Sequence, residues 1–120
     1  MKRKAIWENY YDNLYTWANN NEIKLPSVPE YCTQSYHLFY ALMPSLEIRN
    51  RFIDHLKQNG IISSFHYLPL HLSKMGRKYG GKEGDCPITE SISNRLVRLP
   101  MYFSLDINDI DFEKFYGFQI

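Results

Sequence analysis

Two histidines and a tyrosine stand close together in the segment Phe65–His71, which directly follows a predicted strand. They are His66, Tyr67 and His71, and Pro69 lies among them. Imidazole accepts or donates a proton near neutral pH, and both imidazole and phenol groups form hydrogen bonds with hydroxyl and phosphate oxygens. Because the segment leaves a strand and enters a loop, it can present these groups at the mouth of a cleft. The pattern is typical of proton transfer or sugar binding.

Spacing alone leaves other interpretations of these residues open. In the plainest one, His66 and His71 are loop histidines that bond to backbone groups. Zinc binding is an alternative, although the spacing of its potential ligands matches no zinc signature: His37, His66, His71 and Cys86. A hydrolase is disfavoured because neither cysteine has a local partner and no Gly-x-Ser-x-Gly motif occurs. The Gly80-Gly81-Lys82 run lacks the spacing of a phosphate-binding loop.

Composition fits one small domain of ordinary globular balance, with 120 residues, 44% hydrophobic and 22% charged. Aromatic residues make up 16%, which suggests that some rings cover an interface. A net charge of +1 argues against a nucleic-acid partner. No apolar run approaches the roughly 20 residues that span a bilayer, so no membrane partner is expected. Cys32 and Cys86 form no CxxC motif and are expected to be free thiols, which predicts a cytoplasmic protein.

Hydrophobic periodicity predicts an alternation of helices and strands. Ile6, Tyr10 and Leu14 recur at helical spacing, and Ser45 and Gly60 are good start and stop residues for a second helix. The predicted elements are a helix at 3–18, a connector at 22–34, a strand at 35–43, a helix from Ser45 to Gly60, a strand at 61–67, a loop at 70–86, a helix marked by Ile88, Ile92 and Leu96, a short strand at 98–102 and a last helix capped by Asp106.

This order predicts an α+β fold, with a small antiparallel or mixed sheet of about three strands packed against helices. His37 falls on a strand that is apolar on both faces, so we expect a structural role for it. Residues 70–86 carry four glycines and several lysines, and we expect a mobile loop with room for one helical turn. The carboxylates near the C-terminus are explained by a helix start, where they complement the dipole.

Six segments stand in a specific order along the chain: Ile6–Tyr11, Leu25-Pro26 with Pro29, Ser35–Tyr40, Lys57–Ile61, Phe65–His71 and Arg95–Met101. Taken together they resemble the C-terminal part of the DegT/DnrJ/StrS sugar aminotransferases. The resemblance covers essentially the whole chain. Within that family, the likeness is closest to the transaminases of dTDP-4-amino-4,6-dideoxygalactose.

The resemblance implies that residues 1–120 form the small C-terminal domain of a type I aminotransferase dependent on pyridoxal phosphate (PLP). Residues 1–21 would be the helix that links it to a large PLP-binding domain. The family moves an amino group from glutamate to a nucleotide-linked 4-keto-6-deoxy sugar. Its cofactor-lysine motif, Ser-Phe-His-x-x-Lys, is matched only in its first half by Ser64-Phe65-His66. We therefore expect the large domain to be absent, no cofactor to be bound by this chain, and the fragment to be inactive alone.

By resemblance, His66, Tyr67 and His71 lie near the substrate cleft and contact the sugar nucleotide, while no catalytic, cofactor or metal residue is assigned. The nucleotide sugar and glutamate are the partners expected for the complete enzyme, in lipopolysaccharide synthesis. Self-association is expected because surface meant for the large domain would be bare. The Gly76–Gly84 loop would act as a lid or contact a partner subunit. The alternative is a stand-alone binding or regulatory module that kept the small-domain fold.

Overall fold

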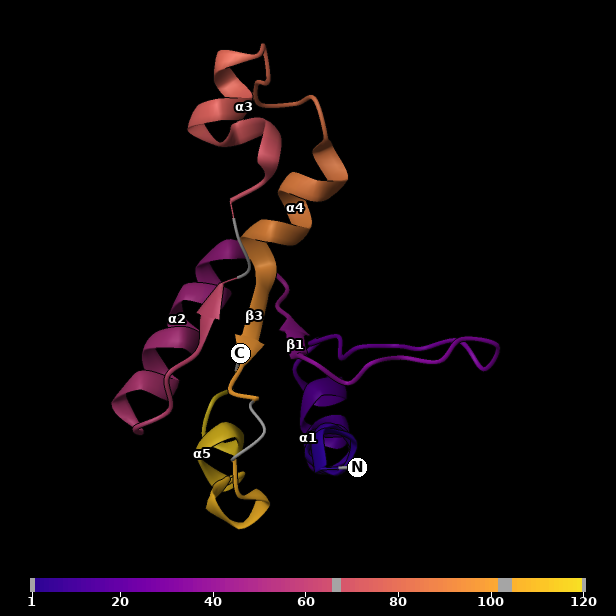
Figure 1. The fold of residues 1–120 in the computed structure, drawn as a ribbon. Helices are drawn as coiled ribbons and strands as arrows, with labels where there is room; N and C mark the ends of the chain where they lie inside the picture. Colours follow the sequence, from indigo (N-terminus) through magenta and orange to yellow (C-terminus); the bar gives the residue numbers. More distant parts are fainter. Residues whose placement is uncertain (1, 66–67, 102–104, 120) are drawn as a thin grey trace.

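The computed structural model describes residues 2–65, 68–101 and 105–119, and Figure 1 shows their arrangement. The elements in chain order are α1 (Lys2–Asn20), β1 (Phe39–Leu42), α2 (Leu46–Gln58), β2 (Ser64–Phe65), the 3-10 turn η1 (Leu70–Leu72), α3 (Lys74–Lys78), α4 (Pro87–Arg95), β3 (Leu96–Leu99), the 3-10 turn η2 (Ile107–Asp109) and α5 (Glu113–Tyr116). The predicted α+β class is confirmed.

The three strands form one antiparallel sheet in the order β1-β3-β2. The central strand β3 pairs with β1 from Phe39↔Leu99 to Leu42↔Leu96, and with β2 at Ser64↔Arg98 and Phe65↔Val97. Strands of two to four residues are too short to be stable by themselves. The sheet therefore depends on the helices that cover it, and its central strand carries the chain from α4 to the C-terminal segment.

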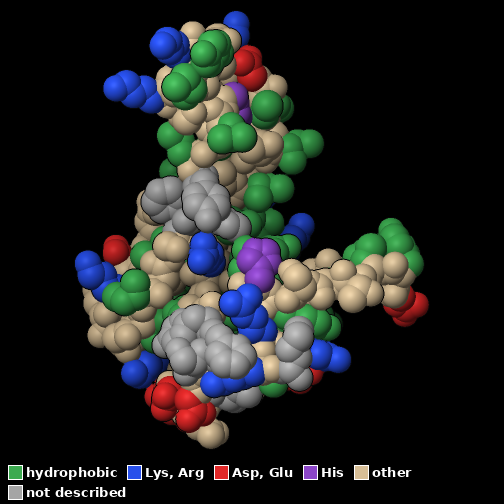
Figure 2. Space-filling model, in the orientation of Figure 1, with side chains coloured by type: hydrophobic (Ala, Val, Ile, Leu, Met, Phe, Trp, Pro, Cys, Tyr) green, Lys and Arg blue, Asp and Glu red, His purple; other side chains and the backbone are tan. Residues whose placement is uncertain are grey.

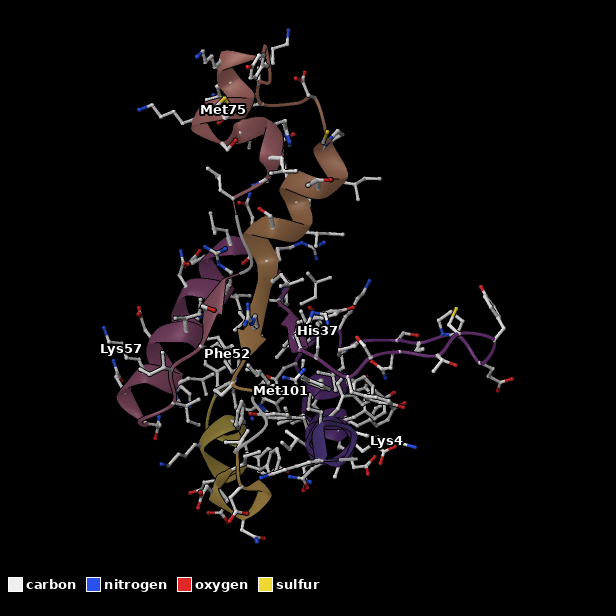
Figure 3. The ribbon with its side chains drawn as sticks, viewed as in Figure 1. Lys4, His37, Phe52, Lys57, Met75 and Met101 are labelled. Carbon is white, nitrogen blue, oxygen red and sulfur yellow. The ribbon has the colours of Figure 1, made fainter. Side chains whose placement is uncertain are left out.

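One face of α1 supplies much of the hydrophobic core. Ile6, Tyr10 and Leu14, which the periodicity places on one face, are all buried. At the end of this face, the indole of Trp17 packs against rings of two other helices. Its ring centroid lies 5.6 Å from that of Phe52 in α2 and 6.3 Å from that of Phe115 in α5. Figure 3 shows Phe52 directed from α2 into the body. Part of the high aromatic content thus fills the core.

Helix α2 begins and ends as its sequence predicts. The Ser45 hydroxyl accepts a hydrogen bond from the Ile48 amide at 3.2 Å, which satisfies an N–H group of the first turn. Gly60 has a φ of 82°, a left-handed conformation that glycine adopts without steric cost. Phe52 and Leu56 form the buried stripe between these ends.

The first strand is shorter than predicted and starts at Phe39. Tyr36 has a φ of 55°, and a residue in this left-handed region cannot continue an extended strand. Apolar alternation alone cannot reveal such a turn. The segment before Phe39 therefore belongs to the connector that follows α1, which leaves the body as a long excursion in Figure 1.

The C-terminal third differs from prediction in two places. Leu96 was predicted on a helix, but it begins β3 because its backbone is extended and it pairs with Leu42. The last helix is divided into η2 and the short α5. Asp106 does cap, since its Oδ1 accepts a hydrogen bond from Asn108 N at 2.9 Å, but it caps only the 3-10 turn.

Residues 70–95 form a projecting substructure, here called the α3–α4 unit, at the end of the molecule opposite α5 (Figure 1). The molecule is accordingly elongated, with principal extents of 47 × 33 × 26 Å. No helix in the described ranges is long and apolar enough to cross a bilayer.

Candidate functional site

The structure places one of the three predicted site residues. His71 lies in η1, at the start of the α3–α4 unit. His66 and Tyr67 lie outside the described residues, so the prediction that all three face one cleft stays a prediction.

The imidazole of His71 faces the carboxylate of Glu90, which lies in the first turn of α4. Nε2 of His71 lies 3.3 Å from Oε2 of Glu90, and the two side chains are 15% and 17% exposed. The Nε2 atom is fully enclosed, and its contact with the carboxylate falls short of hydrogen-bond geometry. This arrangement joins η1 to α4 through a close contact between two titratable groups.

Glu90 also organises the turn that precedes its own helix. Its carboxylate accepts hydrogen bonds from the Gly84 amide at 3.0 and 3.1 Å and from the Cys86 amide at 3.2 Å. The hydrogen bond from Gly84 lowers the pKa of the Glu90 carboxyl, burial opposes this, and His71 and the Cys86 amide add to the lowering. The anion is thus the form that the surroundings favour.

Two glycines allow the α3–α4 unit to close tightly over His71. A Cβ at Gly76 would lie 1.9 Å from the Leu70 carbonyl oxygen, and a Cβ at Gly81 would lie 2.2 Å from the His71 carbonyl oxygen. Only glycine leaves space for backbone at these distances. The glycine-rich segment, predicted as a mobile loop, contains η1, α3 and this close packing, so it has more internal order than the sequence suggested.

Ser73 closes the same substructure at the start of α3. Its hydroxyl accepts a hydrogen bond from Gly76 N at 3.0 Å and donates one to the Leu70 carbonyl oxygen at 2.7 Å. An N-cap of this kind fixes where a short helix begins. His71 is therefore held from one side by a capped turn and from the other by Glu90.

His37 does not lie on a covered strand, which corrects the prediction made for it. It precedes β1, its side chain is exposed, and its Nδ1 lies 3.2 Å from the Ser35 hydroxyl. Figure 3 shows it at the base of the connector, away from the α3–α4 unit. Among the described residues no three His, Cys, Asp or Glu side chains gather as a metal site would require, so the zinc alternative gains no support.

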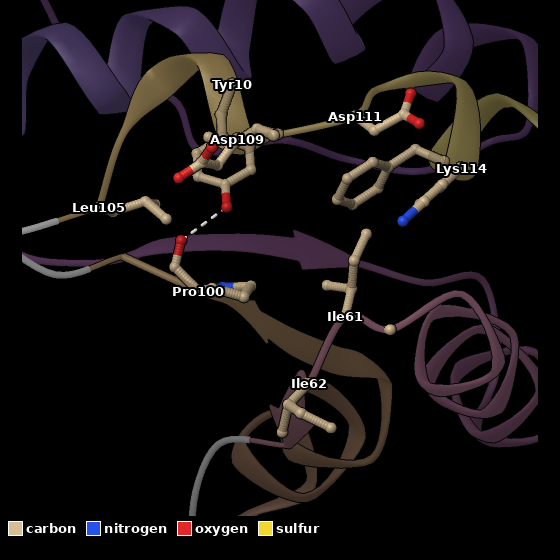
Figure 4. Close-up of a pocket in the computed structure, with 11 residues that line it drawn as sticks. Tyr10, Ile61, Ile62, Pro100, Leu105, Asp109, Asp111 and Lys114 are labelled. Atoms are coloured by element: carbon tan, nitrogen blue, oxygen red, sulfur yellow. Dashed lines mark hydrogen bonds between the residues drawn. The ribbon is translucent and has the colours of Figure 1, made fainter.

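A cavity of about 400 Å³ lies elsewhere, between the sheet and the C-terminal segment (Figure 4). Ile61 and Pro100 line it from the sheet side, and Asp109, Asp111 and Lys114 add charged groups. Tyr10 closes its inner wall, where its hydroxyl donates a hydrogen bond to the Pro100 carbonyl oxygen at 2.6 Å. Two carboxylates at the rim disfavour an anionic ligand there.

Sequence reasoning overlooked Glu90. A signal for it was present, because Pro87 is a good first residue of a helix and an acidic residue in that first turn can reach back to the amide of the cap. The contact with His71 had no such signal, since it joins residues 19 positions apart across a folded turn. The site that the structure offers is therefore an imidazole whose buried nitrogen is fixed by a carboxylate.

Comparison with known proteins agrees with this fold. The model of the DegT/DnrJ/EryC1/StrS aminotransferase family matches residues 1–112. An uncharacterized protein of Methanocaldococcus jannaschii is 35% identical over 113 residues, which are 91% of this chain and 28% of the relative. The dTDP-3-amino-3,4,6-trideoxy-alpha-D-glucose transaminase of Micromonospora megalomicea is 29% identical over 112 residues, 89% of this chain and 29% of the relative.

Solved structures of aminotransferases have the same fold over most of this chain. The aminotransferase TlmJ of Streptoalloteichus hindustanus has a TM-score of 0.75 and 28% identity, over 97% of this chain and 29% of that one. DesV of S. venezuelae, in complex with a ketimine intermediate, has a TM-score of 0.76 and 29% identity, over 88% of this chain and 27% of that one. The chain thus spans less than a third of the length of the relatives that it matches.

Proposed function

Because the chain belongs to the DegT/DnrJ/EryC1/StrS aminotransferase family, we propose that it is the C-terminal part of a PLP-dependent nucleotide-sugar aminotransferase. In the complete enzyme, an amino group would pass from glutamate to a dTDP-4-keto-6-deoxyhexose. The observation that carries this proposal is the family match over residues 1–112, together with solved aminotransferases that follow the same fold over most of the chain.

The carbon of the sugar that receives the amino group, and the use of the product, extend this proposal. The Micromonospora relative is named for an amino group at C3 of the sugar, whereas the sequence resemblance favours C4. We propose C4, with the product used in lipopolysaccharide synthesis in the cytoplasm. Assay of dTDP-4-keto-6-deoxyglucose against a 3-keto sugar, with the complete enzyme, would decide the carbon.

The lysines of this chain do not fit the cofactor. A solved relative, NtdA of Bacillus subtilis, is described with bound PMP, the amine form of PLP. A lysine that forms a Schiff base must be desolvated enough to lose its proton. All lysines of the chain are exposed except Lys114, which is half-buried in the cavity that Asp109 and Asp111 also line. This supports the proposal that the cofactor lysine lies outside these 120 residues and that the chain alone is inactive.

We propose that His71, with His66 and Tyr67, contacts the nucleotide sugar at one side of the substrate cleft. The support is chemical, because an imidazole of defined orientation is a good partner for a sugar hydroxyl. Removal of one such hydrogen bond typically costs about 0.5–1.5 kcal/mol of binding free energy. His71→Ala in the complete enzyme would therefore raise KM for the nucleotide sugar more than it lowers kcat.

A spectrophotometric titration of the chain with PLP tests the fragment proposal directly. We expect no stable aldimine absorption band and no amino transfer from glutamate. Lys114→Ala is the matched variant, because Lys114 is half-buried whereas the other lysines are exposed. A band that disappears in this variant, or any turnover by the wild-type chain, would refute the proposal.

A second candidate is a stand-alone binding or regulatory module. It is favoured by a match to a protein of Geobacillus stearothermophilus named "Pleiotropic regulatory protein", 34% identical over 68 residues, 56% of this chain. The coding sequence upstream of Met1 separates the two. An in-frame upstream segment with a cofactor lysine supports the enzyme, and a promoter with a start codon at Met1 supports the module.

A further inference from the structure

Glu90 has no part in the function proposed above, yet its carboxylate faces His71 and is largely enclosed. Only 17% of its side chain is exposed, and both oxygens accept hydrogen bonds from backbone amides. Oε2 is the oxygen that also faces Nε2 of His71, at 3.3 Å. A carboxylate that two backbone amides hold has a fixed position, and it can therefore orient the imidazole that it faces.

The chemistry of the contact decides where the imidazole carries its proton. An ionised carboxylate is only an acceptor, and neutral imidazole has one donor nitrogen and one acceptor nitrogen. Nε2 is enclosed against the carboxylate, so a lone pair on Nε2 would face a second lone pair with no water between them. The neutral ring avoids this repulsion by carrying the proton on Nε2, which leaves Nδ1 as the acceptor.

We propose that Glu90 is a positioning residue for His71, which holds the imidazole proton on Nε2 and so presents Nδ1 as a hydrogen-bond acceptor to a ligand. If His71 contacts the nucleotide sugar, as in the proposed function on which this part rests, the ligand group must be a donor. Sugar hydroxyls donate, whereas the ionised oxygens of a diphosphate do not. Neutral His71 then recognises the sugar rather than the diphosphate.

The substitution Glu90→Gln separates this role from a structural one. With the NH₂ group in the place of Oε2, where it faces His71, the glutamine carbonyl oxygen still accepts from Gly84 but no longer from Cys86. An NH₂ donor opposite Nε2 favours the tautomer in which Nε2 carries the lone pair and Nδ1 carries the proton. The turn can therefore survive while the tautomer of His71 changes.

The experiment is ¹⁵N NMR of the His71 ring in the 120-residue chain at about pH 9, where imidazole is ordinarily neutral. The ring nitrogen shifts report the tautomer. We expect the Nε2–H form in a severalfold excess in the wild-type chain, because the 3.3 Å contact with the carboxylate is attractive although it falls short of hydrogen-bond geometry. We expect the excess to fall severalfold in Glu90→Gln. Glu83→Gln is the control, because Glu83 is exposed on the same turn and the change is chemically identical.

Two results would overturn the role of Glu90. One is a wild-type ring with the Nδ1–H form equal or in excess, which requires no variant to fold. The other is an unchanged tautomer in Glu90→Gln while the Gly84 amide signal stays in place and the Cys86 signal moves, as expected when the NH₂ group faces His71. A change in Glu83→Gln as large as in Glu90→Gln would also count against it, since the effect would then be general to the turn.

The ligand is tested separately, with dTDP-glucose and dTDP added to the complete enzyme with the same ring label, because this chain supplies only one side of the proposed cleft. We expect dTDP-glucose to shift the His71 Nδ1 signal and dTDP to leave it unchanged. A response to dTDP alone would overturn the preference for the sugar hydroxyl. No response to either, with the expected tautomer present, would contradict the proposed substrate contact of His71 and leave the role of Glu90 intact.

Discussion

Gly76 packs directly against the backbone of the turn that carries His71. The position that its Cβ would occupy is 1.9 Å from the Leu70 carbonyl oxygen and 2.9 Å from the His71 Cα. Both neighbours are backbone atoms, which cannot rotate away as the end of a side chain can. The identity of a single residue therefore decides whether η1 and α3 can close on each other.

We expect Gly76→Ala to destabilise the α3–α4 unit by about 1–3 kcal/mol, the usual cost of overpacking. Amide hydrogen exchange across residues 70–81 would measure it as lost protection. Gly117→Ala is the matched control, because a Cβ there meets nothing closer than 3.6 Å and the backbone is helical. Its effect should be neutral or slightly stabilising. Equal effects of the two substitutions would contradict the packing argument.

Glu90 gives the α3–α4 unit a defined pH dependence. Its pKa is lowered in the folded chain, chiefly by the hydrogen bond from the Gly84 amide, with burial acting in the opposite direction and His71 and the Cys86 amide assisting. The stabilisation is fully present above the ordinary carboxyl pKa of about 4.3 and is lost as the pH falls through the lowered folded value.

We therefore expect the Gly84 and Cys86 amide signals to move toward their unfolded positions as the pH falls below about 4, when followed by NMR. Glu90→Gln should abolish this step, and Glu83→Gln should leave it unchanged. Persistence of the step in Glu90→Gln would assign it to another group.

At the scale of elements, α1 is joined to the rest of the chain by hydrogen bonds from its aromatic side chains. The buried Tyr10 hydroxyl donates to the Pro100 carbonyl oxygen, just after β3, at 2.6 Å. The Trp17 indole donates to the Phe118 carbonyl oxygen at 2.9 Å. These bonds bridge about 90 and 100 residues of sequence, so they fix the first helix against the last third of the chain.

Tyr10→Phe should lower the free energy of unfolding by about 0.5–1.5 kcal/mol, because it removes the donor to Pro100 and leaves that carbonyl without it. Urea denaturation followed by tryptophan fluorescence would measure the change. Tyr116→Phe is the control, since its hydroxyl also makes a 2.6 Å hydrogen bond, to the Asn13 carbonyl oxygen, but at an exposed site where water can replace it. A larger loss at Tyr116 than at Tyr10 would contradict this account.

At the scale of the whole molecule, apolar side chains gather on the surface of the α3–α4 unit. Figure 2 shows hydrophobic groups over this end of the molecule, and Figure 3 places Met75 there, far from the core around Phe52. Leu70 is 86% exposed, Tyr79 80% and Ile88 75%. Large exposed apolar side chains concentrated on one unit typically mark a surface that another body covers.

We expect the isolated chain to self-associate through this surface, as the sequence predicted from its aromatic content. Sedimentation velocity over a range of concentrations should show a rising average mass, and the double substitution Leu70→Ser with Ile88→Ser should suppress the rise. Tyr31→Ser is the control, because Tyr31 is equally exposed but lies on the connector after α1. A wild-type chain that stays monomeric at high concentration would refute the prediction.

The sequence by itself determined the elements whose signals are local. The stripe of Ile6, Tyr10 and Leu14, the cap at Ser45 and the stop at Gly60 each act within a few residues, and the structure has them as predicted. The family could also be recognised from the sequence, because the resemblance depends on the order of short segments along the chain and not on their contacts in space.

Only the tertiary structure decided where strands begin and what surrounds His71. Tyr36 has a left-handed conformation, which local periodicity does not reveal. Leu96 pairs with Leu42 and does not continue the helix, because a pairing partner far away in sequence overrides local periodicity. The contact of His71 with Glu90, and the close packing of Gly76 and Gly81, arise when a glycine-rich turn folds back on itself. Distances across such a turn are set by backbone geometry, which residue spacing alone does not specify.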